Sequence, residues 1–473
     1  MRAVALALLG LCACAAPGAG RHGGPAGSAP AAIDYDAAAR DARALLTALV
    51  AADTTSPPGN EARAVALGVE RLRRAGIPYE VTEFGPGRQN VVARLRGDGS
   101  APPLLLLAHT DVVGAEGQSW STSPHVVTER DGYLIGRGVD DDLGMAALGL
   151  EVLLLLHETR VPLARDVILA WTGDEESGGA GIRWLLAHRP DAVRAALALN
   201  EGGSPVLGDD GRVRFVSLQT AEKSYQDYGI TARGPTGHSS VPLADNAIYR
   251  LAAGLERLGR QRFPARLLPV TRAYLAARAG VEEGELARAM RVAVRAPGAI
   301  PPAALAVLDR DPLLAASLRT TCVATTVTGG TRRNALPADA VANVNCRILP
   351  DESVADVQAT LARVLRDPEL VIRPTEEFAA AAPSPLEGEG PAAIRRVADA
   401  MWPGAPIVPF MSRVATDSRF LRDAGIPAYG LSPIPTTEAD ARRAHGADER
   451  IPLASLRTGV EFLHRLVLEL AAR

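Results

Sequence analysis

The sequence has no strong excess of charge of either sign. Its 473 residues include 51 Lys and Arg and 54 Asp and Glu, which gives a net charge of −3. A chain this close to neutrality has no electrostatic reason to bind nucleic acid or an anionic membrane surface, and we expect no nucleic acid among its partners. The sequence also shows no internal repeat and no apolar run long enough to span a bilayer as a helix.

Cysteine is scarce, with four residues, two of which lie near the N-terminus. The other two, Cys322 and Cys346, lie in strand-like runs on either side of a turn. They would face each other if this hairpin were symmetric about Asn334. Export from the cell would permit a disulfide there, whereas a pair of buried thiols is an equal alternative because the register of a hairpin depends on its loop.

The first residues, "MRAVALALLGLCACAAPGAG", have the layout of a secretory leader. Arg2 is followed by a short apolar run and then by small residues. We therefore expect residues 1–32 to form a signal peptide and a flexible tether, and the protein to be exported: periplasmic, membrane-anchored as a lipoprotein, or secreted. "LCAC" loosely resembles a lipoprotein cleavage site, which would place a lipid anchor on Cys14. A disordered start is the alternative.

Helical and strand-like patterns alternate from about Ala37 to Thr220. The short apolar runs "PLLLLAHTD", "DVILAWTGDEE" and "AALALNEGG" each end abruptly in polar residues. Such runs are typical of parallel strands that are buried on both faces. Between the first two, "LGMAALGLEVLLLLHE" has the length of a helix. This organisation predicts an α/β fold.

The pattern changes in the middle of the chain. Residues 222–380 read as a small α+β unit that contains a helical insertion at about 260–318, rich in Pro and Ala. After it, the α/β pattern resumes. We therefore predict one catalytic domain in two parts, residues 33–221 and 381–473, interrupted by a smaller domain.

Polar side chains at the strand ends are the first candidates for chemistry, because ligands of open α/β sheets bind beyond the carboxyl ends of the strands. His109 and Asp111 point to the same side of a strand, and a carboxylate often holds the second nitrogen of a metal-binding His. Glu175 and Glu176 end the second run, where one can bind metal while the other acts as a general base. A solvated acidic loop or a helix cap is the alternative. Glu201 ends the third run.

Three adjacent aspartates, Asp140 to Asp142, precede the helical run in "GRGVDDDLG". One carboxylate would be enough to cap a helix, and the crowding of three becomes favourable beside divalent cations. Later in the chain, "ARRAHGADERIP" places His445 in a polar loop, where by itself it indicates only a surface residue. Two His and three carboxylates would suit zinc, and a shared carboxylate would allow two metal ions about 3.5–4 Å apart.

In order and spacing, these motifs resemble those of the dizinc aminoacylase and carboxypeptidase family, which includes glutamate carboxypeptidase, carboxypeptidase S and dipeptidases. The resemblance runs from about Thr54 to the C-terminus. It is carried by "TTSPPGNE", "LLAHTDVV", "GRGVDDDLG", "TGDEESGG", "LNEGG", "GPTGHSSVP", "GGTRRNALP", "NVNCRILP" and "AHGADERIP". It implies a zinc-exopeptidase-like α/β fold, in which a smaller α+β lid and dimerisation domain interrupts a mixed-sheet catalytic domain.

The resemblance also implies two Zn²⁺ per chain, with Co²⁺ or Mn²⁺ as possible substitutes. The ligands it implies are two His and three carboxylates: His109 and Glu201 for one zinc, Glu176 and His445 for the other, and Asp141 bridging both. Asp111 would orient His109. Glu175 would take a proton from the bridging water and pass it to the leaving nitrogen.

Three lid residues match further positions of the family. His238 would stabilise the oxyanion, often in the partner subunit's site. Asn334 and Arg347 would bind the free carboxylate of the substrate, and a structural salt bridge is the alternative for Arg347. Many relatives have Lys where this chain has Leu143, which is not a ligand. Asp142 is expected to support the start of the helix, and no role follows for Asp140.

Together these observations predict a metal-dependent hydrolase that cleaves an amide bond next to a free carboxylate. The leading hypothesis is an exported dizinc exopeptidase, either a carboxypeptidase or a dipeptidase, that takes peptides and forms a homodimer through its lid. The alternative is a deacylase of N-acyl amino acids. A remote alternative is a non-catalytic peptide-binding lipoprotein, against which the intact Glu175 and ligand set argue.

Overall fold

The computed structural model describes residues 33–375 and 382–473. The expected signal peptide, tether and Cys14 anchor lie outside the described residues, as does the predicted boundary at residue 380. By its internal contacts Asp34–Arg473 forms one compact unit, so the division into a catalytic and a lid domain stays a prediction. Every helix in the described ranges is too short or too polar to cross a membrane.

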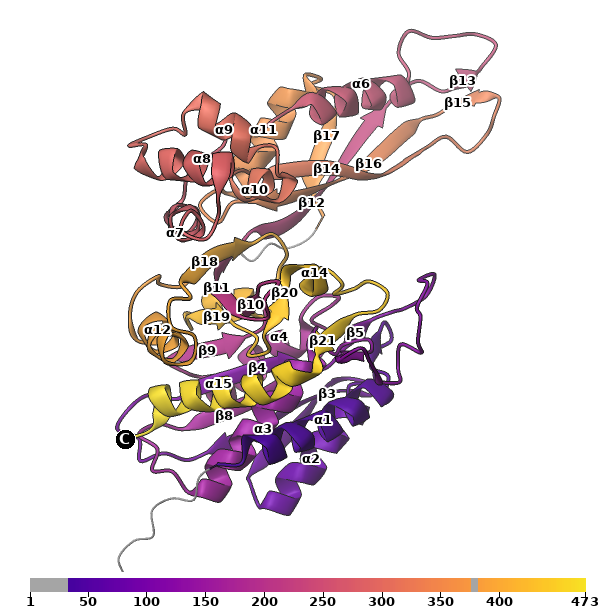
Figure 1. The fold of residues 1–473 in the computed structure, drawn as a ribbon. Coiled ribbons are helices and arrows are strands. Elements are labelled where there is room, and N and C mark those ends of the chain that lie inside the picture. Colours follow the sequence, from indigo (N-terminus) through magenta and orange to yellow (C-terminus); the bar gives the residue numbers. More distant parts are fainter. Residues whose placement is uncertain (1–32, 376–381) are drawn as a thin grey trace, which may run out of the picture. The chain divides into compact units, whose positions relative to one another are not determined.

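A ten-stranded mixed sheet forms the larger part of the fold (Figure 1). Its central strands β4 (Leu104–His109), β8 (Val167–Thr172) and β9 (Leu197–Asn200) are parallel and buried at every position. These are the three apolar runs that were predicted as buried parallel strands, and the prediction is confirmed. His109 pairs with Thr172, so β4 and β8 end level with each other at the same end of the sheet.

The remaining strands extend this sheet on both sides. β3 and β2 lie on one side, and β19, β11, β10 and β20 lie on the other, with β18 paired to β11. The pairs β2–β3, β3–β8 and β10–β11 are antiparallel, which makes the sheet mixed as predicted. The bounds are β2 Tyr79–Gly85, β3 Arg88–Leu95, β10 Pro205–Leu207, β11 Val213–Glu222, β18 Ile407–Ser412, β19 Ala428–Gly430 and β20 Thr436–Thr437.

Helices cover both faces of the large sheet, and each face has its own apolar core (Figure 1). The predicted helix after the three aspartates is α3, and most of its side chains are buried between the sheet, α1 and α15. The helices of this face are α1 Tyr35–Ala51, α2 Ala62–Ala75, α3 Leu143–Thr159, α12 Glu389–Met401 and α15 Leu453–Ala471. Those of the other face are α4 Ala180–His188, α5 Pro190–Val193 and α13 Ser418–Asp423.

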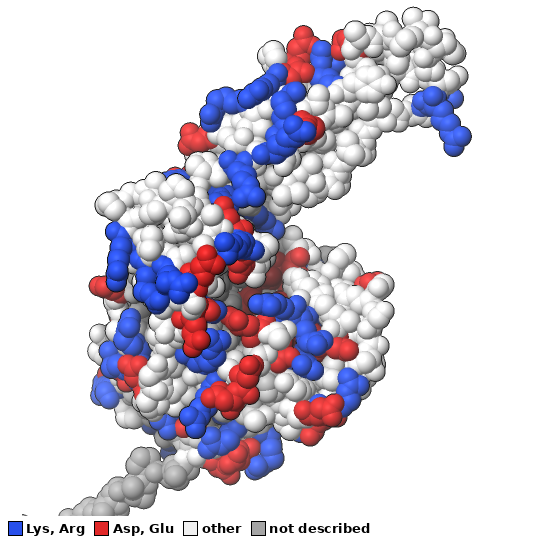
Figure 2. Space-filling view, turned by 45° about the horizontal axis from the view of Figure 1, so that its top comes forward, with Lys and Arg blue, Asp and Glu red and all other residues white. Residues whose placement is uncertain are grey.

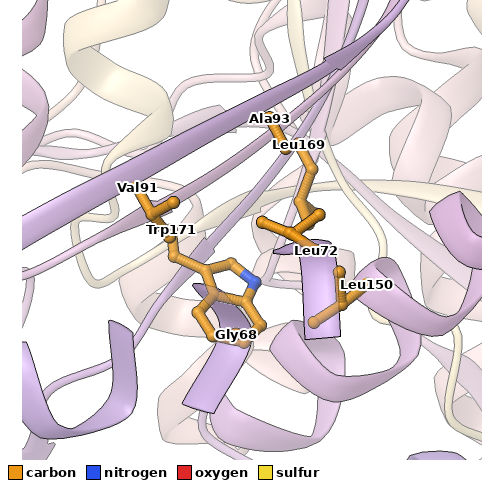
Figure 3. A pocket seen from close by; sticks show the side chains of 7 residues that line it. All are labelled: Gly68, Leu72, Val91, Ala93, Leu150, Leu169 and Trp171. Atoms are coloured by element: carbon orange, nitrogen blue, oxygen red, sulfur yellow. The ribbon is translucent and has the colours of Figure 1, made fainter. Parts of the chain in front are cut away.

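The packing of α2 on the sheet depends on Gly68. The indole ring of Trp171 lies against this glycine and is enclosed by Leu72, Val91 and Leu150 (Figure 3). A Cβ atom at Gly68 would lie 2.4 Å from the Trp171 ring. Trp171 is 1% exposed, and the space beside its ring is too small for a water molecule. The glycine therefore sets how closely α2 approaches β8.

A second sheet forms the centre of the segment that we call the lid, residues 222–375. Its strand order is β14-β16-β12-β17, and all pairs are antiparallel. Helices α6 and α11 pack on this sheet around an apolar core. The bounds are β12 Ser224–Arg233, α6 Ala247–Arg260, β14 Thr321–Gly329, β16 Asp339–Ile348, α11 Val354–Leu365 and β17 Val371–Pro374.

The predicted hairpin of the lid is present, and its two cysteines are joined. Cys322 of β14 is directly opposite Cys346 of β16, and they form a disulfide. Beyond the disulfide, every residue of β14 from Val323 to Gly329 is exposed, since β14 is an edge strand. Two short strands, β13 (Gly237–His238) and β15 (Ala335–Leu336), pair separately.

The predicted helical insertion is also present and has a core of its own. Its first helix packs against β18 of the large sheet. Lys223, at the junction of the two sheets, donates hydrogen bonds to the carbonyl oxygens of Ala316 and Arg319 where the insertion ends. The helices are α7 Pro269–Arg278, α8 Gly284–Arg295, α9 Pro302–Leu308 and α10 Pro312–Ser317.

The remaining elements are short. β1 (Thr55–Ser56) pairs with β5 (Val112–Val113), and a three-stranded sheet has the order β21-β7-β6. The bounds of the latter are β6 Thr128–Arg130, β7 Tyr133–Ile135 and β21 Arg450–Pro452, and α14 covers Glu438–Ala441.

Candidate metal centre and active site

The chain brings the predicted metal ligands to one end of the large sheet. Asp141 lies just before α3, and His445 lies in the loop between α14 and β21. His445 has a φ of 63°, a left-handed conformation that is uncommon outside glycine and is found more often at functional sites. The strand ends supply the others: His109 ends β4, Glu176 follows β8, and Glu201 follows β9 directly.

Asp141 lies between the two histidines. Its Oδ1 is 3.1 Å from Nε2 of His109, and its Oδ2 is 3.1 Å from Nε2 of His445. On the His445 side, Oε2 of Glu176 is 3.0 Å from the same nitrogen. On the His109 side, Oε1 of Glu201 is 3.9 Å from its Nε2. One carboxylate thus presents one oxygen to each pair of ligands, which is the arrangement expected of a bridging ligand.

The donor set fits divalent metal ions. Two groups of three side chains have ligand atoms within 4.8 Å of one another: His109 with Asp141 and Glu176, and His109 with Glu175 and Glu201. These groups differ from the ligand sets that the resemblance implied. His445 belongs to neither group, and Glu175, which was expected to be the general base, belongs to the group with His109 and Glu201. Oε1 of Glu176 is buried without a hydrogen-bond partner. Buried nitrogen and oxygen donors, one of them unpaired, suit zinc and similar ions.

The electrostatics of the site reflect several carboxylates that are crowded around two histidines. Burial raises the pKa of Glu201 well above its usual value, and the neighbouring charges of Asp141 and Glu175 raise it further. Burial likewise raises the pKa of Glu175. Hydrogen bonds that His445 donates to the carboxylates of Asp141 and Glu176 raise its pKa to about 10. Such carboxylate crowding is costly unless cations balance it.

Asp111 fixes the backbone of the Glu175–Glu176 turn. Its carboxylate accepts hydrogen bonds from the backbone N–H of Glu175 at 3.1 Å and of Glu176 at 3.2 Å. Nδ1 of His109 lies 2.9 Å from the main-chain oxygen of Asp111 and 3.5 Å from its carboxylate. Asp111 therefore lies where it can orient His109, as the resemblance implied, and it also holds the turn.

The expectation for Asp142 is wrong as to its side chain. Asp142 occupies the N-cap position of α3, but its carboxylate makes no cap hydrogen bond. Instead, Oδ2 accepts a hydrogen bond from the backbone N–H of His109 at 3.3 Å, while Oδ1 is buried without a partner. The side chain of Asp142 therefore bonds to the last residue of β4 and not to the first turn of its own helix.

Sequence reasoning missed Glu449, which holds the loop of three aspartates. Its Oε1 accepts hydrogen bonds from the backbone N–H groups of Asp140 and Asp141, at 3.0 and 3.1 Å. Its Oε2 is 2.7 Å from Nη1 of Arg137, and both side chains of this ion pair are buried. Glu449 lies four residues after His445, so this ion pair ties the His445 loop to the Asp141 loop. Asp140 contributes through its backbone, which is why no role followed from its side chain.

A pocket of about 1310 Å³ opens beside the donor set. Glu175 lines this pocket, and none of the described residues donates a hydrogen bond to its carboxylate. Arg347 also lines it and stacks on the ring of Tyr225, with its Cζ 4.7 Å from the ring centre. The structure thus brings Arg347 to the pocket. Asp141, Glu176, Glu201 and His445 are among its other lining residues.

The structure does not bring His238 and Asn334 to this pocket. Neither of them lines it, and His238 is exposed on β13. They lie close to each other, since the backbone N–H of Ser239 donates to the carbonyl oxygen of Asn334 at 3.1 Å. Leu143 is buried at the start of α3 and is not in the donor set.

Comparison with known proteins identifies relatives along most of the chain. The model of "Peptidase family M20/M25/M40" matches residues 105–469. The N-fatty-acyl-amino acid synthase/hydrolase PM20D1 from Homo sapiens is 29% identical over 379 residues, which cover 78% of this chain and 74% of that protein. Aminoacylase-1 from Homo sapiens is 27% identical over 430 residues, which cover 89% and 92%.

Solved structures share the fold. An M20 family metallo-carboxypeptidase, Sso-CP2 from Sulfolobus solfataricus, aligns with a TM-score of 0.69 and 18% identity, covering 91% of this chain and 99% of that one. A dinuclear metal binding peptidase of the M20 family from Bacillus subtilis aligns with a TM-score of 0.58 and 14% identity, covering 92% and 97%.

The family model extends from β4, which carries the first candidate ligand, into the last helix, α15, and so spans well over half of the chain. This confirms the resemblance that the motifs indicated. The protein is therefore a hydrolase that belongs to peptidase family M20/M25/M40.

Proposed function

We propose that this protein is a metal-dependent exopeptidase, a carboxypeptidase or dipeptidase, that cleaves an amide bond next to a free carboxylate. The observation that carries the proposal is Asp141, whose two oxygens face two histidines at 3.1 Å each. His109, Asp141, Glu176, Glu201 and His445 would hold two divalent cations, Zn²⁺ or in its place Co²⁺ or Mn²⁺. When bound, such a pair supplies Lewis acidity for the attacking water and the scissile carbonyl.

The residues around this centre would divide the remaining work. Arg347, stacked on Tyr225, offers its in-plane N–H donors to the free carboxylate of the substrate. The Glu175 carboxylate would take a proton from the attacking water, whose oxygen bonds to the carbonyl carbon. The protonated Glu175 would then give that proton to the leaving nitrogen as the C–N bond breaks. Asp111 holds the backbone that positions Glu175.

Glu175→Gln tests this proposal. The variant should lose turnover by at least about 100-fold, the range for general base catalysis, while it keeps the metal content of the wild type. Glu158→Gln is the matched control, since Glu158 is exposed near the C-terminal end of α3, whereas Asp141 precedes the N-terminal end of that helix. Full activity of Glu175→Gln would refute the role, and loss of both metals would mean that Glu175 is a ligand.

A second candidate is a hydrolase of N-acyl amino acids. The two relatives named above, an N-fatty-acyl-amino acid synthase/hydrolase and an aminoacylase, favour it. Both reactions use the same centre and the same free carboxylate and differ only in the acyl side of the scissile bond. A screen of dipeptides and N-acyl amino acids, with products identified by mass spectrometry, distinguishes them.

We also propose that a second copy of the chain completes the site through the lid. β14 is an edge strand with Val323 and Val327 61% and 65% exposed, and an exposed apolar edge favours pairing with another strand. The end of the lid that carries β13 and β15 is largely uncharged in Figure 2. His238 lies there, outside the pocket of its own chain.

Mixing two inactive variants tests the shared site. Glu175→Gln and His238→Ala should each be inactive, and their mixture should regain part of the activity, because one site of each mixed dimer has both residues intact. A mixture as inactive as its components, or a monomer by light scattering, would refute the shared site.

Export and zinc as the native metal remain part of the proposal, and secretion assays and metal analysis of the purified protein test them.

A further inference from the structure

Three arginines line the pocket beside the donor set: Arg183, Arg347 and Arg419. No carboxylate of the described residues lies within ion-pair distance of any of them. Nε of Arg419 is buried and has no hydrogen-bond partner. The pocket thus combines the carboxylates of the donor set with three guanidinium groups that form no ion pair with the described residues.

Aromatic rings hold these guanidinium groups in place. Cζ of Arg419 lies 4.4 Å from the centre of the Phe420 ring, and Cζ of Arg183 lies 5.9 Å from the same ring. Arg347 lies on Tyr225 in the same way. Stacking occupies the face of a guanidinium group and leaves its in-plane N–H donors available. Planar donors of this kind match the two oxygens of a carboxylate.

Arg347 and Arg419 are close enough to affect each other. Burial lowers the pKa of Arg347 from its usual value, and the positive charge of Arg419 lowers it further, against Tyr225 and Asp227. Asp227 is already engaged: its carboxylate accepts hydrogen bonds from Tyr225 at 2.6 Å and from Asn343 and Asn345 at 3.0 and 2.8 Å. Glu222 and Asp417 act on the charge of Arg419 from beyond ion-pair distance. A second substrate carboxylate would therefore give Arg419 a direct partner, as the first would for Arg347.

We propose that Arg419 determines specificity by binding a second carboxylate of the substrate, on the side chain of the residue whose α-carboxylate Arg347 would hold. The preferred substrates are then amides of glutamate or aspartate. This inference rests on the proposed function for the place of the α-carboxylate. What the inference itself predicts is a difference in affinity between ligands whose side chains have the same shape but differ in charge. This difference can be measured without turnover.

Binding of L-glutamate and L-glutamine to the zinc-loaded protein tests the inference by calorimetry. The wild type should bind glutamate about tenfold to a hundredfold more tightly, as expected for a hydrogen-bonded charge pair. Arg419→Gln should bind both ligands equally, and Arg419→Lys should retain part of the preference. Arg395→Gln is the matched control, because Arg395 is exposed on α12 and does not line the pocket, and it should keep the full preference.

Three results would overturn the assignment. In the first, the wild type binds both ligands equally or binds neither. In the second, Arg419→Gln keeps the preference for glutamate. In the third, Arg419→Gln weakens the binding of both ligands by the same factor. The last result would place Arg419 on the shared α-carboxylate. In parallel, kcat/KM is compared for N-acetyl-glutamate and N-acetyl-glutamine and for Ala-Glu and Ala-Gln. A protein that prefers glutamate in calorimetry but hydrolyses none of these would refute the proposed function and leave the role of Arg419 supported.

Discussion

Glu449 gives the sharpest test of how the bridging aspartate is held. Its carboxylate makes two hydrogen bonds to the backbone of Asp140 and Asp141 and an ion pair with Arg137, all within the buried interior. Removing one partner of a buried ion pair costs about 3–5 kcal/mol, and each backbone N–H left without an acceptor adds about 1 kcal/mol. Glu449→Ala should therefore lower the free energy of unfolding by about 5–7 kcal/mol.

Glu449→Gln separates the two contributions. The amide oxygen of Gln can still accept both backbone N–H groups, so this variant loses mainly the charge opposite Arg137 and should fall between the wild type and Glu449→Ala. Both variants should bind zinc about 10- to 100-fold more weakly, as is typical when an outer support of a metal site is lost. The cause is that the backbone carrying Asp141 is less firmly placed.

The assay is urea unfolding followed by tryptophan fluorescence, with chelator and with zinc, together with zinc affinity by competition. Glu70→Ala is the control, because it removes only exposed ion pairs with Arg73 and Arg74 on α2 and should leave the midpoint nearly unchanged. A Glu449→Ala protein with the unfolding midpoint and zinc affinity of the wild type would refute the reasoning. It would mean that the Asp141 loop keeps its shape without this support.

Two further predictions concern stability away from the site. Gly68→Ala should destabilise the protein by about 1–3 kcal/mol, because the new methyl group collides with the enclosed ring of Trp171; a higher melting temperature would contradict this packing. His464 is buried, contacts the Tyr35 hydroxyl at 3.0 Å, and its pKa is lowered by burial from 6.5 to about 4. The unfolded chain therefore binds this proton more readily, and stability is complete above about pH 6.5 and falls by about 3 kcal/mol as the pH drops to 4. His464→Phe should remove that part of the pH dependence, and an unchanged pH profile would contradict it.

The sequence was sufficient for the central strands and the residues at their ends. Short apolar runs that end abruptly in polar residues are typical of buried parallel strands, whose carboxyl ends share one end of the sheet. His109, Glu176 and Glu201 could therefore be expected close together before any coordinates. The choice of Asp141 among the three adjacent aspartates followed from the resemblance alone.

The contacts that support the site could not be predicted in the same way. Glu449 and Asp140 are 309 residues apart in the sequence, and nothing in the loop "HGADERIP" indicates that its Glu turns inward. For Asp142, local capping rules predicted a bond to its own helix, but a contact with the end of β4 replaced it. That Nε of Arg419 is buried without a hydrogen-bond partner is likewise a property of the folded pocket alone.

The disulfide between Cys322 and Cys346 has a consequence for assembly. It closes a loop of 24 residues at one end of β14 and so holds this edge strand extended before any partner arrives. Much of the conformational entropy that a free strand would lose on pairing is then lost during oxidation, and association starts from an ordered template. Under reducing conditions the same edge would fray, and the dimer proposed above would then form less readily.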